Sequence, residues 1–312
     1  MNNTATPAAN AAKHDVYEII TEQIISQLEK GTVPWQQPWT EAGLPQNLIS
    51  KRPYRGINVW LLASLGYSEN YFLTYKQLKE FGGSVKKDEK AHIVVYWNYI
   101  EKDLEGKENG TQQSNGKKKV PFLRYYRVFN VAQCNDIPEM FIKPVTRQAY
   151  PIPACEDIVA KMPQCPSIRH KDQRAYYHPL SDFVNMPKKE TFKSDESYYA
   201  TLFHELMHST GHHSRLNRST LIQMTEFGSE PYSHEELVAE IGTCYLESLG
   251  GIITSEFERN ASYIQGWLDK LRNDKKFIIS ASAHAQKAVD FILNVKFEEK
   301  ESAEVKDEEA HP

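Results

Sequence analysis

Residues 198–211 read YYATLFHELMHSTG, with His204 and His208 four positions apart and Glu205 directly after the first histidine. The apolar spacing and the closing Gly211 predict a single helix. On a helix, residues four apart share a face, so both imidazoles can bind one metal ion. Glu205 is then placed to accept a proton from a water molecule on that ion. The segment therefore predicts a metal-dependent hydrolase site.

The third metal ligand is expected on a second predicted helix, which carries EELVAE at residues 235–240. A catalytic zinc site has three protein ligands and one open position. Glu236 fits the ligand role, and Glu240, one turn later, could hold a ligand histidine from behind. The reverse assignment of these two glutamates stays open, as does a merely solvated acidic helix face.

Spacing argues against a rival ligand set, the motif HExxHxxGxxH. Gly211 occupies the glycine position of that motif, but the position of the third histidine holds Ser214. His212 and His213 miss it by one or two places. We therefore favour the glutamate ligand and expect these two histidines at the surface.

Length and composition favour two domains in an ordinary globular protein. The 312 residues are 40% hydrophobic and 25% charged, and one hydrophobic core seldom serves a chain of this length. The first 150 residues carry four more basic than acidic side chains, and the remainder carries eight more acidic than basic ones. Such asymmetry favours two modules with different partners.

The same composition bears on location. We see no apolar run of membrane length and no recognisable signal peptide, so we expect no membrane partner. Four scattered cysteines do not form a disulfide framework. We expect a cytoplasmic protein.

Periodicity in the front half predicts short helices and two long strands. Helices are expected over 16–28, 59–65 and 74–81, strands over 92–100 and 123–131, a flexible hairpin loop over 102–119, and a linker over 137–153.

The back half reads as short strands followed by helices. Strands are expected within 176–186, and helices over 196–210, 234–249, 256–273 and 279–295. The predicted fold class is α+β, with a small α+β domain over 14–145, a second domain over 150–297 and a disordered acidic tail over 298–312.

Basic and aromatic residues alternate in two segments of the front half. Single-stranded nucleic acid is held by basic grooves with aromatic platforms on which bases stack. Because side chains alternate along a strand, only one face of each strand can point at DNA. The alternative is a small domain with an aromatic core. The candidate DNA contacts are Lys51, Arg52, Tyr54, Arg55, Asn58, Arg124, Tyr125 and Arg127.

Two sets of motifs resemble one known family. HELMHSTGHHSRLNR (204–218), Phe-Gly (227–228) and EELVAEIGTCYL (235–246) resemble the zincin-type metallopeptidase domain of ArdC-like antirestriction proteins. GTVPW (31–35), KRPYRGIN (51–58) and RYYRVFNVAQ (124–133) resemble the single-stranded-DNA-binding domain of that family. The polar loop, the acidic tail and the glutamate at 240, where related zincins often have aspartate, depart from the pattern.

The resemblance implies a protein that protects incoming mobile-element DNA from restriction. We expect His204, His208 and Glu236 to bind Zn²⁺ and Glu205 to act as general base on an unidentified protein substrate. Tyr232 and His234 are candidates by position for stabilising the oxyanion. We expect residues 181–186 to contain the edge strand that aligns the substrate.

Two other functions compete with this one. The chain could be a DNA-binding shield whose zinc site is structural or whose peptidase activity is accessory. A zinc-dependent nuclease is less favoured, because a single HExxH site lacks the second metal that phosphodiester cleavage generally uses.

Overall fold

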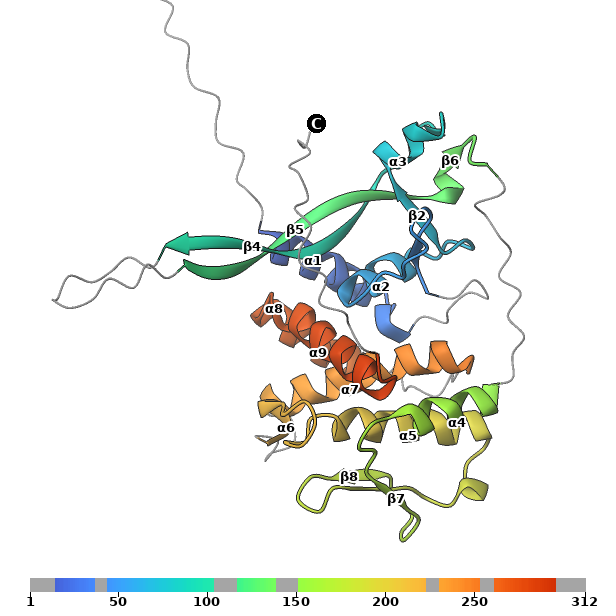
Figure 1. Cartoon of the computed structure of the whole chain (residues 1–312), viewed down its shortest axis with the longest axis vertical. Helices are drawn as coiled ribbons and strands as arrows, with labels where there is room; N and C mark the ends of the chain where they lie inside the picture. Colours follow the sequence, from blue (N-terminus) through green and yellow to red (C-terminus); the bar gives the residue numbers. More distant parts are fainter. Residues whose placement is uncertain are drawn as a thin grey trace, which may run out of the picture.

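The structure is a computed structural model that describes residues 15–36, 44–103, 117–138, 151–222, 230–252 and 261–295. The front half forms a sheet flanked by short helices, and the back half is a stack of helices above a small sheet (Figure 1). Both halves mix helices and strands, which confirms the predicted α+β class.

The front half contains the predicted helices and both long strands, with bounds within a few residues of expectation except at the hairpin. Asp15 caps the first helix by accepting a hydrogen bond from the Tyr17 amide. The elements are α1 (Val16–Glu29), the 3₁₀ turn η1 (Pro34–Gln36), β1 (Gln46–Asn47), α2 (Ile57–Ala63), β2 (Tyr71–Thr74), α3 (Tyr75–Glu80), β3 (Ser84–Val85), β4 (His92–Asp103), β5 (Lys117–Asn130), the 3₁₀ turn η2 (Val131–Gln133) and β6 (Cys134–Asn135).

The main sheet has the strand order β1-β2-β5-β4, and β3 pairs separately with β6. The pairing of β4 with β5 is antiparallel and runs from His92 opposite Val128 to Asp103 opposite Lys117. The hairpin strands therefore continue into the stretch expected to be a loop, and the hairpin projects from the body (Figure 1). The rest of that expected loop, 104–116, lies outside the described residues.

The back half holds the predicted helices and four elements that the sequence analysis missed, at 151–161, 167–169, 189–191 and 219–222. The elements are α4 (Pro151–Lys161), β7 (Ser167–Arg169), β8 (Tyr176–His178), β9 (Phe183–Asn185), the 3₁₀ turn η4 (Lys189–Thr191), α5 (Asp195–Ser209), α6 (Ser219–Ile222), α7 (Glu230–Gly250), α8 (Ala261–Asn273) and α9 (Phe277–Ile292). The expected linker over 137–153 is corrected at its end, because the prolines at 151 and 153 occupy the first turn of α4, where no amide donor is needed. Among the described residues, no helix has the apolar length to cross a membrane.

The small sheet corrects one expectation about substrate binding. Its strand order is β7-β9-β8, so β9 is paired on both sides, parallel to β7 and antiparallel to β8. Residues 181–186 therefore contain the central strand and offer no free edge. Hydrophobic alternation marks a strand but does not tell a central one from an edge one, because that depends on its neighbours.

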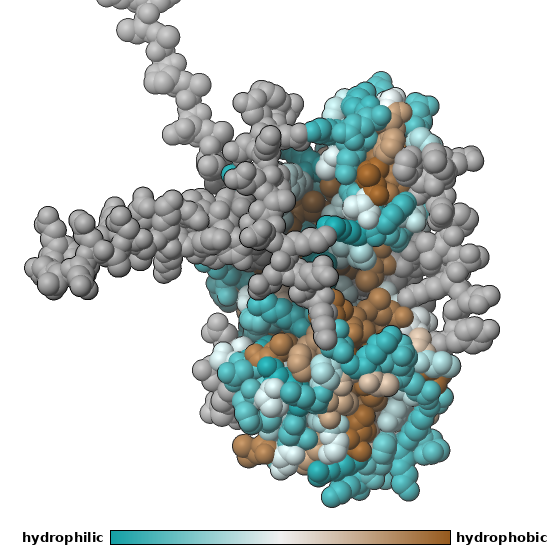
Figure 2. Space-filling view, in the orientation of Figure 1, coloured by the Kyte–Doolittle hydropathy of each residue, from teal (hydrophilic) through white to brown (hydrophobic). Residues whose placement is uncertain are grey.

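The two halves share one hydrophobic core. Trp35 and Trp60 of the front half are fully buried, and the Trp60 ring meets that of Tyr245 at a centroid distance of 4.7 Å. The Tyr245 hydroxyl donates to the carbonyl of Gly56 at 2.9 Å. On the face shown in Figure 2, apolar residues are also exposed along the boundary between the two halves. The front and back halves therefore pack as one body in the described residues.

Candidate metal centre

The site lies between α5 and α7, and Gly242 of α7 makes room for the Met207 side chain of α5. A Cβ atom at Gly242 would lie 1.8 Å from the terminal methyl carbon of Met207, so that side chain would have to move to accommodate any other residue at 242. Ser194 caps α5 by accepting a hydrogen bond from the Ser197 amide. The two helices thus face each other across the histidines that α5 carries.

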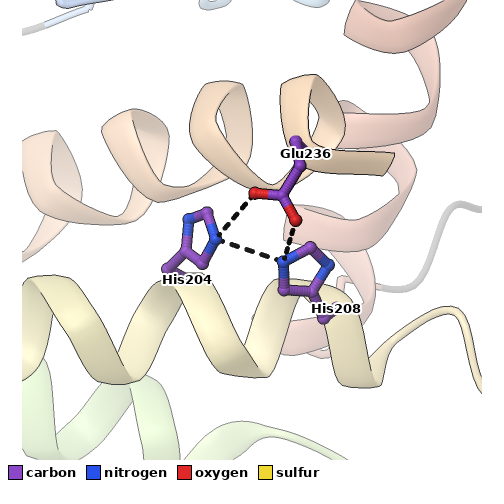
Figure 3. A group of neighbouring side chains, drawn as sticks. All are labelled: His204, His208 and Glu236. Carbon is purple, nitrogen blue, oxygen red and sulfur yellow. Dashed lines mark hydrogen bonds and ion pairs between the residues drawn. The ribbon is translucent and has the colours of Figure 1, made fainter. Parts of the chain in front are cut away.

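His204, His208 and Glu236 point toward a common centre (Figure 3). The Nε2 atoms of the two histidines are 3.1 Å apart. Each Nε2 is 3.5 Å from an oxygen of Glu236. Ligands about 2.0–2.1 Å from one ion at tetrahedral angles lie about 3.3 Å from one another. The donor set and its spacing therefore fit a tetrahedral divalent metal site with one position left for water or substrate.

Glu205 lies beside this centre. Glu205 is 9% exposed, and its negative charge contributes to the raised pKa values of His208 and Tyr232. A carboxylate within reach of the open position is what a general base requires.

The support behind His208 comes from Glu235, which the sequence analysis did not assign. His208 Nδ1 is 3.6 Å from Glu235 Oε1. Burial alone would lower the pKa of His208, but Glu235, Glu236 and Glu205 outweigh that effect and raise it to about 9. The adjacent glutamates at 235–236 are visible in the sequence, but their spacing does not show which ring nitrogen of a histidine each carboxylate faces.

Glu240 has a different neighbour from the one expected. Its Oε2 accepts a hydrogen bond from Trp35 Nε1 at 3.2 Å, so it ties α7 to the front half. In the described ranges, the group able to hold a metal contains Glu236 and not Glu240, which favours our assignment of the ligand over the reverse one. At His208 the supporting carboxylate is Glu235 rather than Glu240.

The two oxyanion candidates point in different directions. The Tyr232 hydroxyl donates to Glu236, and burial together with that carboxylate raises the pKa of Tyr232 to about 12. His234 instead faces α9, where its Nε2 is 3.2 Å from the Ser280 hydroxyl. Tyr232 is the candidate on the metal side.

The other nearby histidines are engaged elsewhere. His212 Nδ1 is 2.8 Å from the Ser214 hydroxyl, and its ring lies against that of His213 at a centroid distance of 4.0 Å. Neither belongs to the cluster that can hold a metal, in agreement with the spacing argument.

The DNA-binding candidates in residues 51–58 differ in availability. Lys51 and Arg52 are exposed, and the Lys51 ammonium lies 4.2 Å from the ring centroid of Tyr71. Tyr54 is half-buried against Phe72, with ring centroids 6.2 Å apart. The last two candidates in this segment, Arg55 and Asn58, make contacts within the protein.

Arg55 and Asn58 make structural contacts. Arg55 forms an ion pair with Asp290 of α9. The Asn58 amide donates to the Val95 carbonyl at 2.6 Å and accepts from the Val95 amide at 2.7 Å, which fixes α2 to β4.

The candidates on β5 lie on the projecting hairpin. Arg124, Tyr125 and Arg127 are all exposed, as is Tyr126, which we had not included. Tyr126 stacks on Tyr96 of β4 with ring centroids 4.6 Å apart and planes 12° from parallel. Alternation places Arg124 and Tyr126 on one face and the other two on the opposite face.

Comparison with known proteins links each half to a domain family. Residues 153–284 match the zincin-like metallopeptidase family. Residues 14–129 match the N-terminal domain of the anti-restriction factor ArdC.

Two similar proteins come from Escherichia coli and Sinorhizobium fredii. An Escherichia coli DNA primase TraC is 35% identical over 309 residues, which are 94% of this chain and 28% of TraC. The protein y4eC of Sinorhizobium fredii is 33% identical over 288 residues, covering 89% of this chain and 91% of y4eC. The chain thus spans little more than a quarter of that TraC but nearly all of y4eC.

Solved structures extend the match to the whole fold. The metal-free crystal structure of the antirestriction protein ArdC from plasmid R388 is 38% identical, with a TM-score of 0.71 over 89% of this chain and 96% of that one. The Mn(II)-bound structure of the same protein gives a TM-score of 0.70 at 38% identity, over 90% and 97% of the two chains. With both domains matched in order and about nine tenths of the chain aligned to R388 ArdC at 38% identity, this chain belongs to the ArdC antirestriction family.

Proposed function

We propose that this chain is a zinc-dependent peptidase of the zincin class joined to a single-stranded-DNA-binding front half, and that it protects incoming DNA from restriction. The observation that carries the peptidase proposal is the convergence of His204, His208 and Glu236 at tetrahedral spacing, with Glu205 close enough for its charge to raise the pKa of His208. A purely structural site generally uses four protein ligands, whereas three ligands leave an open position for chemistry.

The three side chains would hold the metal, and the chain supplies the proton transfers. A bound Zn²⁺ would lower the pKa of a water molecule and polarise the scissile carbonyl oxygen. Glu205 accepts the proton of the attacking water and passes it to the leaving amine. Tyr232 is protonated at neutral pH, as an ordinary tyrosine is, and burial raises its pKa further, so its hydroxyl could donate a hydrogen bond to the developing oxyanion.

Zinc is proposed from the donor set, since two imidazoles and a carboxylate suit it well. The R388 ArdC structure that contains Mn(II) shows that a relative accepts a divalent metal. Manganese is therefore the alternative metal, and competition between the two ions for the wild-type chain would rank them.

The DNA-binding proposal is carried by the β4–β5 hairpin. Exposed arginines can neutralise phosphates, and a stacked tyrosine pair at the surface offers a platform for bases. Arg124, Tyr126 and Tyr96 share one face of this hairpin. Lys51 and Arg52 would extend the basic surface.

Glu205→Gln in the full chain separates the two activities. The amide keeps the size of the side chain and leaves the three ligands in place, but it removes the proton acceptor. We expect metal content and DNA binding to stay at wild-type level while peptide cleavage falls by about 10²–10⁴-fold. An unchanged cleavage rate would contradict the zincin mechanism.

The same variant decides between peptidase and shield. If Glu205→Gln still protects DNA in cells, shielding by the front half is the working function and proteolysis is accessory. If protection is lost while DNA binding is intact, cleavage of a host protein is the mechanism. Labelled single-stranded DNA incubated with and without a chelator tests the nuclease alternative in parallel.

A further inference from the structure

A buried ion pair lies directly behind the metal centre. Arg218 follows α5 in the segment before α6, and Glu235 is the residue before the ligand Glu236 on α7. Their side chains are 4% and 0% exposed. Arg218 donates to both carboxylate oxygens, with Nε 3.1 Å from Oε2. Removing two charges from water costs several kcal/mol unless their geometry and remaining hydrogen bonds are good.

The pair is joined to the last turn of α5, which carries His208. Arg218 Nη2 donates to the carbonyl of Met207 at 2.9 Å, and Nη1 donates to the Thr210 hydroxyl. The Thr220 hydroxyl adds a third hydrogen bond to Glu235, at 2.8 Å. The Glu235 carboxylate is therefore held in one position relative to that turn.

Gly211 provides the space for this arrangement. A Cβ atom at this residue would lie 3.0 Å from Arg218 Nη2 and 3.0 Å from two side-chain carbons of Leu221. Gly211 is also the glycine of the HExxHxxGxxH motif. In this chain the lack of a side chain at 211 is explained by the Arg218 guanidinium that packs against it.

The carboxylate faces the nitrogen of His208 that does not face the metal. His208 Nδ1 is buried and makes no hydrogen bond with the residues that the structure describes, but Glu235 Oε1 lies 3.6 Å from it, while Nε2 faces Glu236. A ligand histidine needs a partner on its second nitrogen to fix the ring orientation and tautomer. We infer that Arg218 and Glu235 are a positioning pair, in which Arg218 holds the Glu235 carboxylate behind His208 so that Nε2 faces the metal. This inference rests on the proposed metal site.

A matched control exists in the same loop. Arg215, whose side chain is 1% exposed, forms an ion pair with Asp182 and donates to the carbonyl of Ser209 at 2.7 Å, so it also holds the end of α5, but its carboxylate partner is Asp182 and not Glu235. Glu235→Gln and Asp182→Asn each replace the carboxylate of a buried arginine by an amide of equal size. Both should lower the unfolding temperature of the metal-free chain.

Metal affinity should separate the two variants. Zn²⁺ affinity, measured by competition with a chelating dye, should fall by about 10–100-fold in Glu235→Gln and stay at the wild-type value in Asp182→Asn. Equal losses in both variants would mean that the effect follows stability, and wild-type affinity in Glu235→Gln would equally overturn the inference.

A charge-free variant separates positioning from packing. Arg218→Met with Glu235→Leu removes both charges, and replacing a buried ion pair by apolar residues is often neutral for stability. The Met207 and His208 carbonyls still accept backbone amides from residues 210 and 211. We expect the unfolding temperature to exceed that of Glu235→Gln while Zn²⁺ affinity stays low. Recovery of affinity together with stability would overturn the positioning role.

The wild-type and Glu236→Ala chains report on the underlying site. Loss of Zn²⁺ in Glu236→Ala with wild-type affinity in Glu235→Gln would remove the positioning pair and leave the metal site standing. A wild-type chain that binds no Zn²⁺ would overturn both.

Discussion

Adjacent glutamates on α7 serve two sides of one histidine. Successive residues on a helix point about 100° apart, so Glu236 reaches His208 Nε2 while Glu235 lies behind its Nδ1. Glu240, one turn further, lies under the Trp35 indole. Three carboxylates within six residues thus have three separate roles.

Removal of a ligand should remove the metal. His204→Ala, His208→Ala and Glu236→Ala each leave two protein ligands, one fewer than a catalytic zinc site uses. Elemental analysis should find about one zinc per wild-type chain and a strong loss in each variant. Glu240→Gln is the control on the same helix. Full zinc in Glu236→Ala and none in Glu240→Gln would reverse the assignment.

Metal binding should depend on pH through His208. In the metal-free chain its pKa is raised to about 9, so the imidazolium is stabilised, and that contribution to folding is lost as pH rises through about 9. A ligand histidine must be deprotonated. Apparent affinity should therefore rise with pH until about 9 and then level off. Calorimetry in two buffers of different ionisation enthalpy should show proton release near neutral pH, and pH-independent affinity would contradict the assignment.

At the scale of elements, the β4–β5 hairpin is the part of the front half with exposed basic and aromatic side chains on both faces. Arg124 to Arg127 are all exposed although strand alternation predicts that half would be buried. Val94, Val95 and Leu123 of the same hairpin are buried, so the body covers part of each face of the hairpin and leaves these four side chains at the surface.

Loss of the stacking platform should weaken single-strand binding. Tyr126→Ala should cost about 1–3 kcal/mol per stacked base, measured by fluorescence anisotropy with a labelled oligonucleotide. Tyr75→Ala is the control, because Tyr75 is 53% exposed but lies on α3. Equal affinity for wild type and Tyr126→Ala would exclude this platform.

The salt dependence should report the phosphate contacts. Each phosphate neutralised on a single strand contributes about 0.7 to the slope of log affinity against log salt. Arg124→Ala should lower the slope by about that amount. An unchanged slope would place the arginine outside the DNA path.

At the scale of the whole molecule, the two families matched by sequence are not independent bodies. The buried side chains of Trp35 and Trp60 lie in the same core as α7, α8 and α9. The Thr21 hydroxyl donates to the carbonyl of Lys275 at 2.7 Å, which adds a polar contact across the junction. The matched families cover residues 14–129 and 153–284, and the domain limits at 145 and 150 stay predictions.

The shared core predicts a single unfolding transition. Trp60→Ala should lower stability by about 3–5 kcal/mol, as large-to-small changes in a core do. Because the indole contacts Tyr245 of α7, the signals of both halves should shift together in chemical denaturation. Two separated transitions, with only the first shifted, would show that the halves unfold independently.

Local patterns along the chain were enough to predict the candidate metal ligands and the order of most elements. HELMH on a helix places two imidazoles on one face, and helical periodicity located α1, α5 and α7 from local information alone. Helix α4 was missed because proline reads as a breaker when its place in the first turn is unknown. The resemblance to the ArdC family also followed from short motifs in their order along the chain.

Only the tertiary structure decided which distant residues support the site. Glu235 lies behind His208 because Arg218, seventeen positions earlier, holds it there, and Trp35 meets Glu240 across 205 positions. The central place of β9 and the engagement of Arg55 and Asn58 likewise depend on neighbours. Local periodicity reports how each residue faces its own element, whereas these contacts are set by how whole elements pack, which no spacing rule encodes.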